Sequence, residues 1–236
     1  MREIFALALA SLVGVVPATA PEGVCEVREV TITWGFKESF RSYISGAIAE
    51  GSWQTSGDVG YSIPEFTFTG GEGYVTPDRT DADVSFEGEL VFSGHEGILD
   101  TTLANPRLTV VDTRSAVLSL DVAGDTMDEV SVREVDVPFV QVVWGSSDED
   151  ILAESGRWEI RGAEVVLTEE GSAAFGTYPA GEVMDPMSLG FLVDEECLQD
   201  AGLGWIPGGA AALAVVASAI ALAIRRGRKS PGPEHP

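Results

Sequence analysis

Histidine, cysteine and basic side chains are scarce in this chain, and each scarcity excludes a class of function. The sequence of 236 residues has two histidines and two cysteines, and one histidine, His235, lies next to the C-terminus. His95 therefore stands alone in the central region, and one histidine without a neighbouring cysteine cannot form a His/Cys zinc site. No nucleophile elbow, phosphate-binding loop or dinucleotide-binding fingerprint occurs. These absences predict a protein that is not an enzyme.

The shortage of positive charge also limits the choice of partner. Lysine and arginine together number 14 against 38 acidic residues, which gives a formal net charge of −24. Five of the basic residues are Arg2 and those within residues 225–229, so residues 4–224 contain nine basic and 36 acidic residues. Such a surface repels nucleic acid and anionic lipid headgroups, and neither is an expected partner. The acids are spread through the chain, which favours a role in solubility.

The two ends of the chain carry patterns typical of membrane targeting. A mostly apolar run follows Arg2, and Ala18-Thr-Ala20 is a small-x-small cleavage motif, which predicts a signal peptide over residues 1–20. Residues 205–224 contain no charge and precede a basic cluster, which predicts a transmembrane helix.

These predictions place the chain in the cell membrane, with a single span, an extracellular ectodomain and a cytoplasmic C-terminus. The remaining predicted parts are an ectodomain over residues 21–199, a linker over 200–204 and a basic cytoplasmic tail over 225–236.

Cys25 and Cys197 lie at the two edges of the predicted ectodomain. An exported chain favours a disulfide between them. Neither cysteine belongs to a CxxC motif or lies beside a plausible base in the sequence, so we expect no redox or nucleophilic role.

Between the cysteines the sequence is typical of short β-strands. Apolar residues alternate with polar ones, as at Phe66, Phe68, Leu90 and Phe92, and glycines interrupt the runs. Strand candidates include residues 65–68, 82–86, 101–103, 107–111, 116–122, 130–136, 137–143, 158–160 and 164–167. Residues 169–171 are predicted to form a turn. The expected fold is all-β with one short helix, a two-sheet antiparallel β-sandwich, followed by the C-terminal transmembrane helix.

The one expected helix lies in the stretch 34–44. Its apolar residues fall at i, i+4, i+7, i+8 and i+11, as one stripe of an α-helix, and are Phe36, Phe40, Tyr43, Ile44 and Ala47. By residue type alone, a tyrosine at the margin of such a stripe is most often a core residue with a satisfied hydroxyl. His95, close to two glycines, is most often an exposed turn residue.

Three motifs together resemble the HtaA-type haem-binding domain. They are Trp34-Gly-x-Lys-x-Ser-Phe-Arg-x-Tyr-Ile44, Phe66-x-Phe68, and Phe92-Ser-Gly-His95-x-Gly97. Tyr178-x-x-Gly181 followed by Asp185-Pro186 fits the closing segment of the family, so the resemblance covers about residues 27 to 192. Members of this family lie on the Gram-positive cell envelope, where they take haem from host haemoproteins or pass it inward to a transporter.

The resemblance implies a role for individual residues. It makes Tyr43 the axial ligand of the haem iron, with His95 hydrogen-bonded to the phenolic oxygen and Tyr178 as a further pocket residue. Tyrosinate is a hard anionic ligand that favours ferric iron, so the expected cofactor is ferric haem b. Candidates for an apolar wall are Phe36, Phe40 and Ile44, and candidates for binding the two propionates are Lys37, Ser39 and Arg41.

The leading hypothesis is a membrane-anchored extracellular protein that captures ferric haem. It would relay haem to other envelope haem-binding proteins and a haem ABC importer, with host haemoproteins as donors. An alternative from a different class is a surface adhesion or structural β-sandwich module that binds protein or glycan. A Ser-His-Asp triad or a carboxylate pair for glycoside hydrolysis is arithmetically available, but nothing marks which residues would form it.

Overall fold

The computed structural model describes one folded unit of the chain. The described residues are 23–125, 131–145, 151–154, 156–194 and 197, and all of them lie in the first of two compact units, residues 1–198. The predicted signal peptide, linker, membrane span and cytoplasmic tail (1–20, 200–204, 205–224 and 225–236) lie outside the described residues. Within the described residues, no helix has the length and apolar character needed to cross a bilayer.

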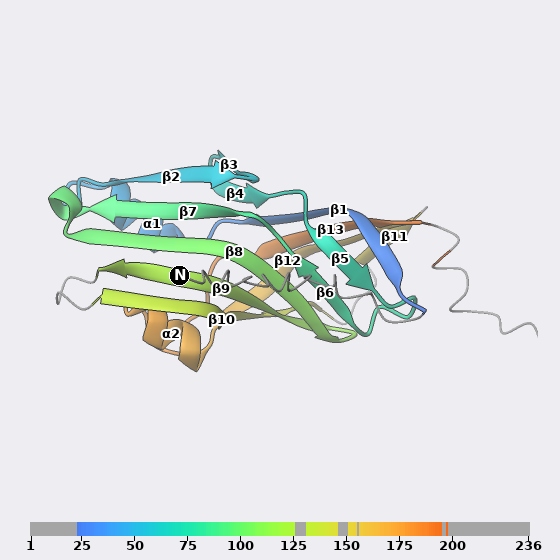
Figure 1. Cartoon of the computed structure of the whole chain (residues 1–236). Coiled ribbons are helices and arrows are strands. Elements are labelled where there is room, and N and C mark those ends of the chain that lie inside the picture. The colour runs from blue at the N-terminus through green and yellow to red at the C-terminus, as the bar shows by residue number, and fades with distance from the viewer. Residues whose placement is uncertain (1–22, 126–130, 146–150, 155, 195–196, 198–236) are drawn as a thin grey trace, which may run out of the picture. The chain divides into compact units, whose positions relative to one another are not determined.

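The described unit is built of β-strands with two short α-helices and one 3-10 turn (Figure 1). The strands are β1 (Cys25–Trp34), β2 (Ser52–Gly57), β3 (Val59–Ser62), β4 (Glu65–Phe68), β5 (Glu72–Val75), β6 (Ala82–Ser85), β7 (Gly88–Gly94), β8 (Leu99–Asp112), β9 (Ser115–Asp125), β10 (Ser131–Val143), β11 (Ile151–Glu154), β12 (Arg157–Leu167) and β13 (Met187–Val193). The helices are α1 (Glu38–Ser45), α2 (Glu169–Phe175) and the 3-10 turn η1 (His95–Gly97).

Hydrogen bonds join the described strands in one antiparallel sheet that closes on itself. Strands β1, β13, β12, β10, β9, β8, β6 and β5 pair in this order, and β5 pairs again with β1. The other strands extend this ring: β4 and β3 from β1, β7 and β2 from β8, and β11 from β12. The all-β prediction is confirmed, but the expected two sheets are one continuous sheet that folds over its own core.

β-Bulges at neighbouring positions allow the long strands β8 and β10 to bend together. Strand β8 has a register shift around Asn105, and β10 has one around Asp136, and both residues have a positive φ, of 48° and 53°. The Asp121 carboxylate on β9, between them, accepts a hydrogen bond from the Asn105 side chain at 2.8 Å and from the Asp136 backbone N–H at 2.9 Å. One side chain thus holds two neighbouring bulges.

These bulges explain why the sequence pattern divided single strands in two. Residues 101–103 and 107–111 belong to the same strand β8, and residues 130–136 and 137–143 fall largely in β10. In β12, the bulge near Gly162 separates the candidates 158–160 and 164–167. A bulge shifts the alternation of apolar residues by one position, so each half reads as a separate strand. Pro138 occupies one such irregular position in β10, where its missing N–H is tolerated.

The second helix, α2, corrects the prediction of a turn at residues 169–171. Thr168 begins the helix as its N-cap, because its hydroxyl accepts a hydrogen bond from the Gly171 N–H at 2.8 Å. Gly176, with a φ of 69°, ends it in the left-handed conformation. A side chain at Gly171 would overlap the Phe139 carbonyl of β10, so glycine allows the helix to pack closely on the sheet. Two short α-helices rather than one therefore lie within the described residues.

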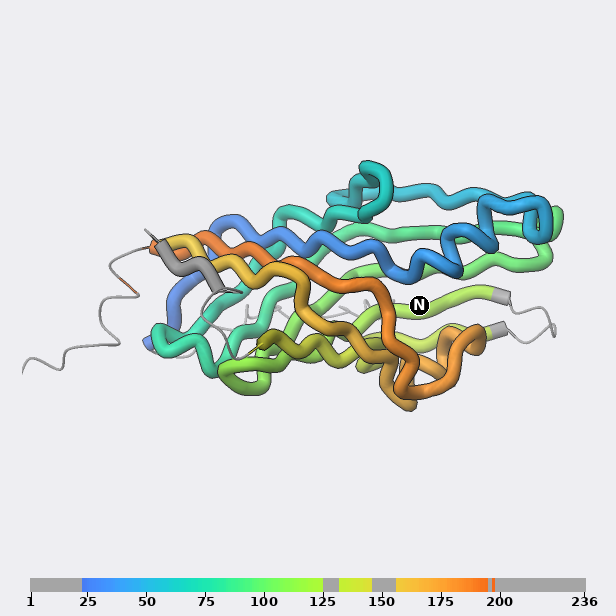
Figure 2. The backbone as a smooth tube through the Cα atoms, turned by 180° about the vertical axis from the view of Figure 1, so that it is seen from behind, coloured from blue at the N-terminus to red at the C-terminus, as the bar shows by residue number. Residues whose placement is uncertain are grey.

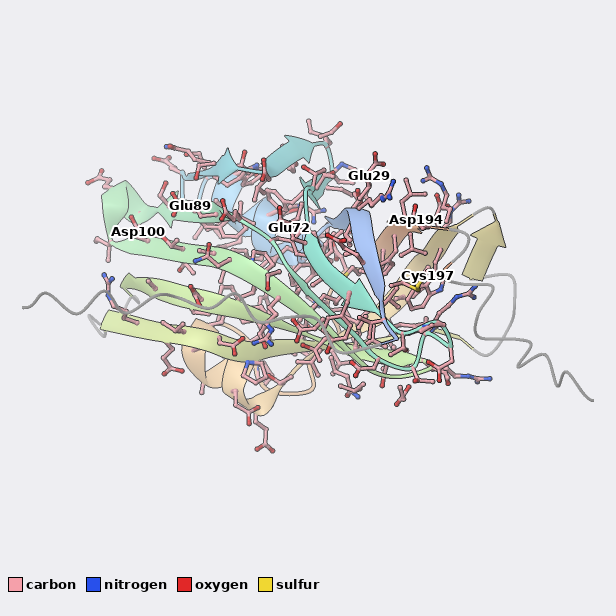
Figure 3. The ribbon with its side chains drawn as sticks, turned by 45° about the vertical axis from the view of Figure 1, so that its right-hand side comes forward. Glu29, Glu72, Glu89, Asp100, Asp194 and Cys197 are labelled. Carbon is pink, nitrogen blue, oxygen red and sulfur yellow. A yellow bond between two sulfur atoms is a disulfide. The ribbon has the colours of Figure 1, made fainter. Side chains whose placement is uncertain are left out.

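Both helices and the turn between β7 and β8 lie at the same end of the described unit, which we call the helical end. Figure 2, viewed from behind, shows the same arrangement. Rings from the sheet and from both helices meet there in an aromatic core formed by Phe36, Phe40, Phe92, Phe139 and Phe175, all at most 4 % exposed. Acidic side chains are exposed on several different strands, among them Glu72, Glu89 and Asp100, which Figure 3 labels.

The predicted disulfide is confirmed. Cys25, at the start of β1, is bonded to Cys197, a few residues after β13, with their Cα atoms 5.6 Å apart (Figure 3). Because β1 and β13 also pair along their length, the disulfide locks the two ends of the folded unit to each other.

Replacing both cysteines, Cys25→Ala with Cys197→Ala, should lower the free energy of unfolding by about 2–5 kcal/mol, because the bond closes a loop with a sequence separation of 172 residues. Urea unfolding followed by tryptophan fluorescence measures the change. Wild-type protein reduced with dithiothreitol serves as the control and should unfold like the double variant. Equal stability of oxidised wild type and double variant would contradict the expectation.

Candidate functional site

The N-terminus of α1 is held by an aspartate, Asp185, that lies 147 residues after Glu38 in the sequence. Lys37 occupies the N-cap position but makes no side-chain capping bond. The Asp185 carboxylate takes this place, because its Oδ1 accepts a hydrogen bond from the Glu38 N–H at 3.0 Å. A negative charge beside the first turn also interacts favourably with the helix dipole. The residue before the cap, Phe36, has a φ of 63°, so the chain turns sharply into the helix.

Asp185 also forms an ion pair with Arg41 of α1. The Arg41 Nη1 atom lies 2.7 Å from Asp185 Oδ2, and the guanidinium donates a further hydrogen bond to the Gly35 carbonyl. The Asp185 backbone carbonyl accepts from the Trp34 indole N–H at 2.9 Å, and its N–H donates to the Phe36 carbonyl at 2.9 Å. Arg41 is 9 % exposed and directed inward. In this structure Arg41 therefore anchors the helix, and its expected role as a propionate partner stays a prediction.

The residues expected to form an apolar wall have different surroundings in the structure. Phe36 and Ile44 are fully buried, and the Phe36 ring contacts five other aromatic rings of the core, so both residues serve packing. Phe40 is also buried, but its ring lies 6.3 Å from that of Tyr43 and 6.5 Å from that of Tyr178. Phe40 therefore supports both tyrosines from behind. Ala47 lies beyond the end of α1 and is exposed, so the apolar stripe is shorter than predicted.

Tyr43 and His95 meet at the helical end. The Tyr43 hydroxyl lies 2.5 Å from His95 Nε2, and both side chains are half-buried. Tyr43 comes from the last turn of α1, whereas His95 begins η1 at the turn between β7 and β8. In this arrangement the imidazole and the phenol can share a hydrogen bond, with either atom as the donor.

The backbone holds His95 in an uncommon conformation. His95 and Glu96 both have a positive φ, of 52° and 57°, although neither is glycine. The His95 N–H donates to the Ala49 carbonyl at 2.7 Å, which ties this turn to the segment after α1. A side chain at Gly94 would lie 3.2 Å from the Ala49 Cβ, so a small residue is favoured where the two segments touch. Uncommon backbone conformations of this kind are concentrated at binding sites.

Tyr178 extends the site along α1. Its hydroxyl lies 3.0 Å from the Ser39 Oγ, and its ring stacks on Phe175 with centroids 6.2 Å apart. Ser39 lies one turn before Tyr43, so the two side chains share a face of the helix. The Ser172 hydroxyl donates to the Tyr178 carbonyl at 2.7 Å, which connects this residue to α2.

Lys37 lies at the same edge. Its Nζ atom is 5.7 Å from the centre of the Tyr178 ring and 2.6 Å from the Glu182 Oε1 atom. The structure thus brings together five of the predicted residues, namely Tyr43, His95, Tyr178, Ser39 and Lys37. It offers an oxygen donor supported by imidazole, apolar rings behind it, and a polar edge of hydroxyls and an ammonium group. This set fits a flat apolar ligand that carries a metal ion and acidic groups.

A groove of about 430 Å³ lies elsewhere, and none of the predicted site residues lines it. It runs over the outer face of β1, β13 and β12, above Gly190. Its two arginines, Arg157 and Arg161, both pair with Glu159, at 3.3 Å and 2.5 Å. The hydrogen bond from Arg161, with a smaller contribution from Arg157, holds the pKa of Glu159 below its usual value. Both arginines of this groove are therefore already paired with Glu159, and the chemistry favours the helical end.

The fold and the tyrosine–histidine pair define an all-β binding domain with an oxygen donor at its helical end. The family model described as Htaa matches residues 29–190, and the chain belongs to the HtaA family. The C-terminal domain of HtaA from Corynebacterium glutamicum is 31 % identical, with 72 % of this chain and 99 % of that chain covered and a TM-score of 0.62. The N-terminal domain of the same protein is 27 % identical, with the same coverage and a TM-score of 0.60.

A further solved structure, haem-binding protein HtaB from Corynebacterium glutamicum, shares the fold. It is 19 % identical, with 72 % of this chain and 97 % of that chain covered and a TM-score of 0.54. The comparison with curated protein sequences gives no match.

Two site residues were missed by the sequence reasoning, Asp185 and Glu182. Asp185 was noticed only as part of an Asp-Pro pair, and nothing local indicated that it caps a helix 147 residues earlier in the chain. Glu182 lies one residue after the Tyr178-x-x-Gly181 motif, among many other acids of the sequence. A buried arginine requires a partner, but the burial of Arg41 is visible only in the structure.

Removing the Asp185 carboxylate by Asp185→Ala should lower the free energy of unfolding by about 3 kcal/mol, because Arg41 is left buried without its partner. The matched control is Asp194→Ala, which breaks the Arg28–Asp194 pair, whose side chains are 65 % and 57 % exposed. That control should cost less than about 1 kcal/mol. Urea unfolding measures both variants, and equal losses would contradict the anchoring role of Asp185.

Proposed function

We propose that this chain is a non-enzymatic protein that binds ferric haem through Tyr43 and His95. The observation that carries the proposal is the 2.5 Å contact between the Tyr43 hydroxyl and His95 Nε2 at a half-buried position. Bound haem supplies a ferric iron, which accepts an anionic oxygen ligand. The Tyr43 oxygen would provide that ligand as a phenolate, and His95 would orient it by donating a hydrogen bond from its Nε2–H to the same oxygen.

The surrounding residues fit the rest of a haem molecule. Phe40 supports the ring of Tyr43 and offers apolar surface beneath a flat macrocycle. Ser39, Tyr178 and Lys37 form a polar edge one turn of α1 away from Tyr43, and they are the candidates for binding the two propionates. An ammonium and two hydroxyls can all donate hydrogen bonds to carboxylates.

The comparisons support a role in haem uptake. The chain belongs to the HtaA family, and the HtaB structure that shares its fold is that of a haem-binding protein. The sequence patterns of residues 1–20 and 205–224 support export and membrane anchoring. We propose that the anchored ectodomain captures haem outside the cell and relays it to other envelope haem-binding proteins and a haem ABC importer.

Tyr43→Phe should abolish the tyrosinate signature of bound haem, because it removes the iron ligand and keeps the ring that packs on Phe40. Hemin titration of the full chain, followed by the Soret band and by ferric electron paramagnetic resonance, measures the loss. The control is Tyr61→Phe, which makes the same chemical change on β3, where the ring packs on Trp53 and Phe66. It should leave the spectrum unchanged.

His95→Ala should weaken binding and not abolish it, because the phenol keeps its position on α1 but loses its hydrogen bond. We expect a fall in hemin affinity of about tenfold, the loss typical of a residue that orients a metal ligand.

A wild-type spectrum in Tyr43→Phe would refute the ligand assignment. A wild-type chain that binds glycan or matrix protein and not hemin would favour the adhesion alternative.

A further inference from the structure

We propose that Glu182 competes with the ligand's carboxylates for Lys37, so that the polar edge of the site holds an exchangeable ion pair. The proposal rests on the proposed function and adds a means of release to it. Its basis is the contact between Lys37 Nζ and Glu182 Oε1, at 2.6 Å, beside the Tyr178 ring.

The ammonium group of Lys37 is already engaged by the protein. Of its three donors, one faces the Glu182 carboxylate and one the Val183 carbonyl, at 2.5 Å, and Tyr178 presents its ring to the same group. The side chains of Lys37 and Glu182 are 18 % and 32 % exposed, so the pair is neither sealed in the core nor freely solvated. A carboxylate that approaches Lys37 from solvent therefore competes with Glu182 for the ammonium group.

Lys37 is also the residue that supplies positive charge at this edge of the site. Of the two basic residues in the stretch 34–44, Arg41 is buried and bound to Asp185. Lys37 alone lies beside the Ser39–Tyr178 hydroxyl pair, where acidic groups of a ligand would be bound. In a chain with 38 acidic residues, which repel a dianionic ligand, an unpaired lysine here would supply a local attraction for it. Glu182 reduces that attraction locally.

Sharing Lys37 with Glu182 affects how fast the ligand dissociates more than whether the site selects it. A ligand bound through Tyr43 keeps its position while one of its carboxylates and Glu182 alternate on Lys37. This lowers the barrier to dissociation, because Lys37 is never left without a partner as the ligand leaves. The arrangement suits a carrier, which must give up its cargo to the next protein.

The first test uses Glu182→Gln in the full chain. The hemin dissociation rate, measured by transfer to excess apomyoglobin, should fall about three- to tenfold, since removal of one competing contact is a change of this size. The matched control is Glu170→Gln, which removes one exposed negative charge from α2 at the same end and should change the rate less than twofold. An equal effect of both variants, or faster dissociation from Glu182→Gln, would overturn the proposal.

The double variant Lys37→Gln with Glu182→Gln, together with the two single variants, forms a double-mutant cycle. In the Lys37→Gln background the second substitution should have no effect on the dissociation rate, because the group for which Glu182 competes is gone. Hemin dimethyl ester, which lacks free carboxylates, should dissociate from wild type and Glu182→Gln at the same rate. A persistent effect of Glu182→Gln in either case would show that it acts by another route and would overturn the proposal.

A readout that needs no haem separates this proposal from the function itself. Lys37 and Lys229 are the two lysines of the sequence, so acetylation of Lys37 can be followed by peptide mass spectrometry with Lys229 as the internal reference. Lys37 should react several-fold faster in Glu182→Gln than in wild type, as its pairing with Glu182 is lost. Unchanged labelling would overturn the ion pair. Faster labelling together with a failure of wild type to bind hemin would refute the proposed function and leave the pair established.

Discussion

The site depends on the attachment of an eight-residue helix to a segment more than 140 residues away. A helix of this length is not stable alone, so its direction is determined by the contacts it makes with the rest of the fold. Asp185 provides these contacts: it caps the helix at Glu38, pairs with Arg41, and binds the backbone of Phe36 and the indole of Trp34. Because Arg41 lies two residues before Tyr43, the anchored helix directs Tyr43 toward His95.

Ring closure explains how such distant residues meet. Strand β1 leads into α1, and the segment that carries Tyr178 and Asp185 leads into β13. Pairing of β1 with β13 therefore places α1 and this segment at the same end, and the disulfide secures the other end of the pair. The third part of the site, the turn with His95, belongs to a different region of the sheet and is tied to α1 through the Ala49 carbonyl. The binding residues are thus assembled by the global fold.

Local sequence patterns predicted most of the strands and the helix, but not how these elements pair with one another. Alternation revealed most strands, and the i, i+4, i+7 spacing found the helix that carries Tyr43. The single sheet was not predictable, because closure is a property of strand pairing, and bulges at Asn105 and Asp136 hid the true strand lengths. The pairing of Arg41 with Asp185 was not predictable for a related reason, because the two residues are 144 positions apart in the sequence.

The distribution of charge at the helical end shows how an acidic protein can still accept an acidic ligand. Arg41 contributes no free charge, because Asp185 neutralises it inside the fold, and Lys37 is shared with Glu182. Strong attraction therefore has to come from the oxygen of Tyr43, whose position is fixed by the helix and by His95. A site with one firm ligand and a weakly charged edge can be selective for a metal-bearing ring without holding its acidic groups tightly. That combination is what the proposed role as a haem carrier requires, since a carrier has to release its ligand.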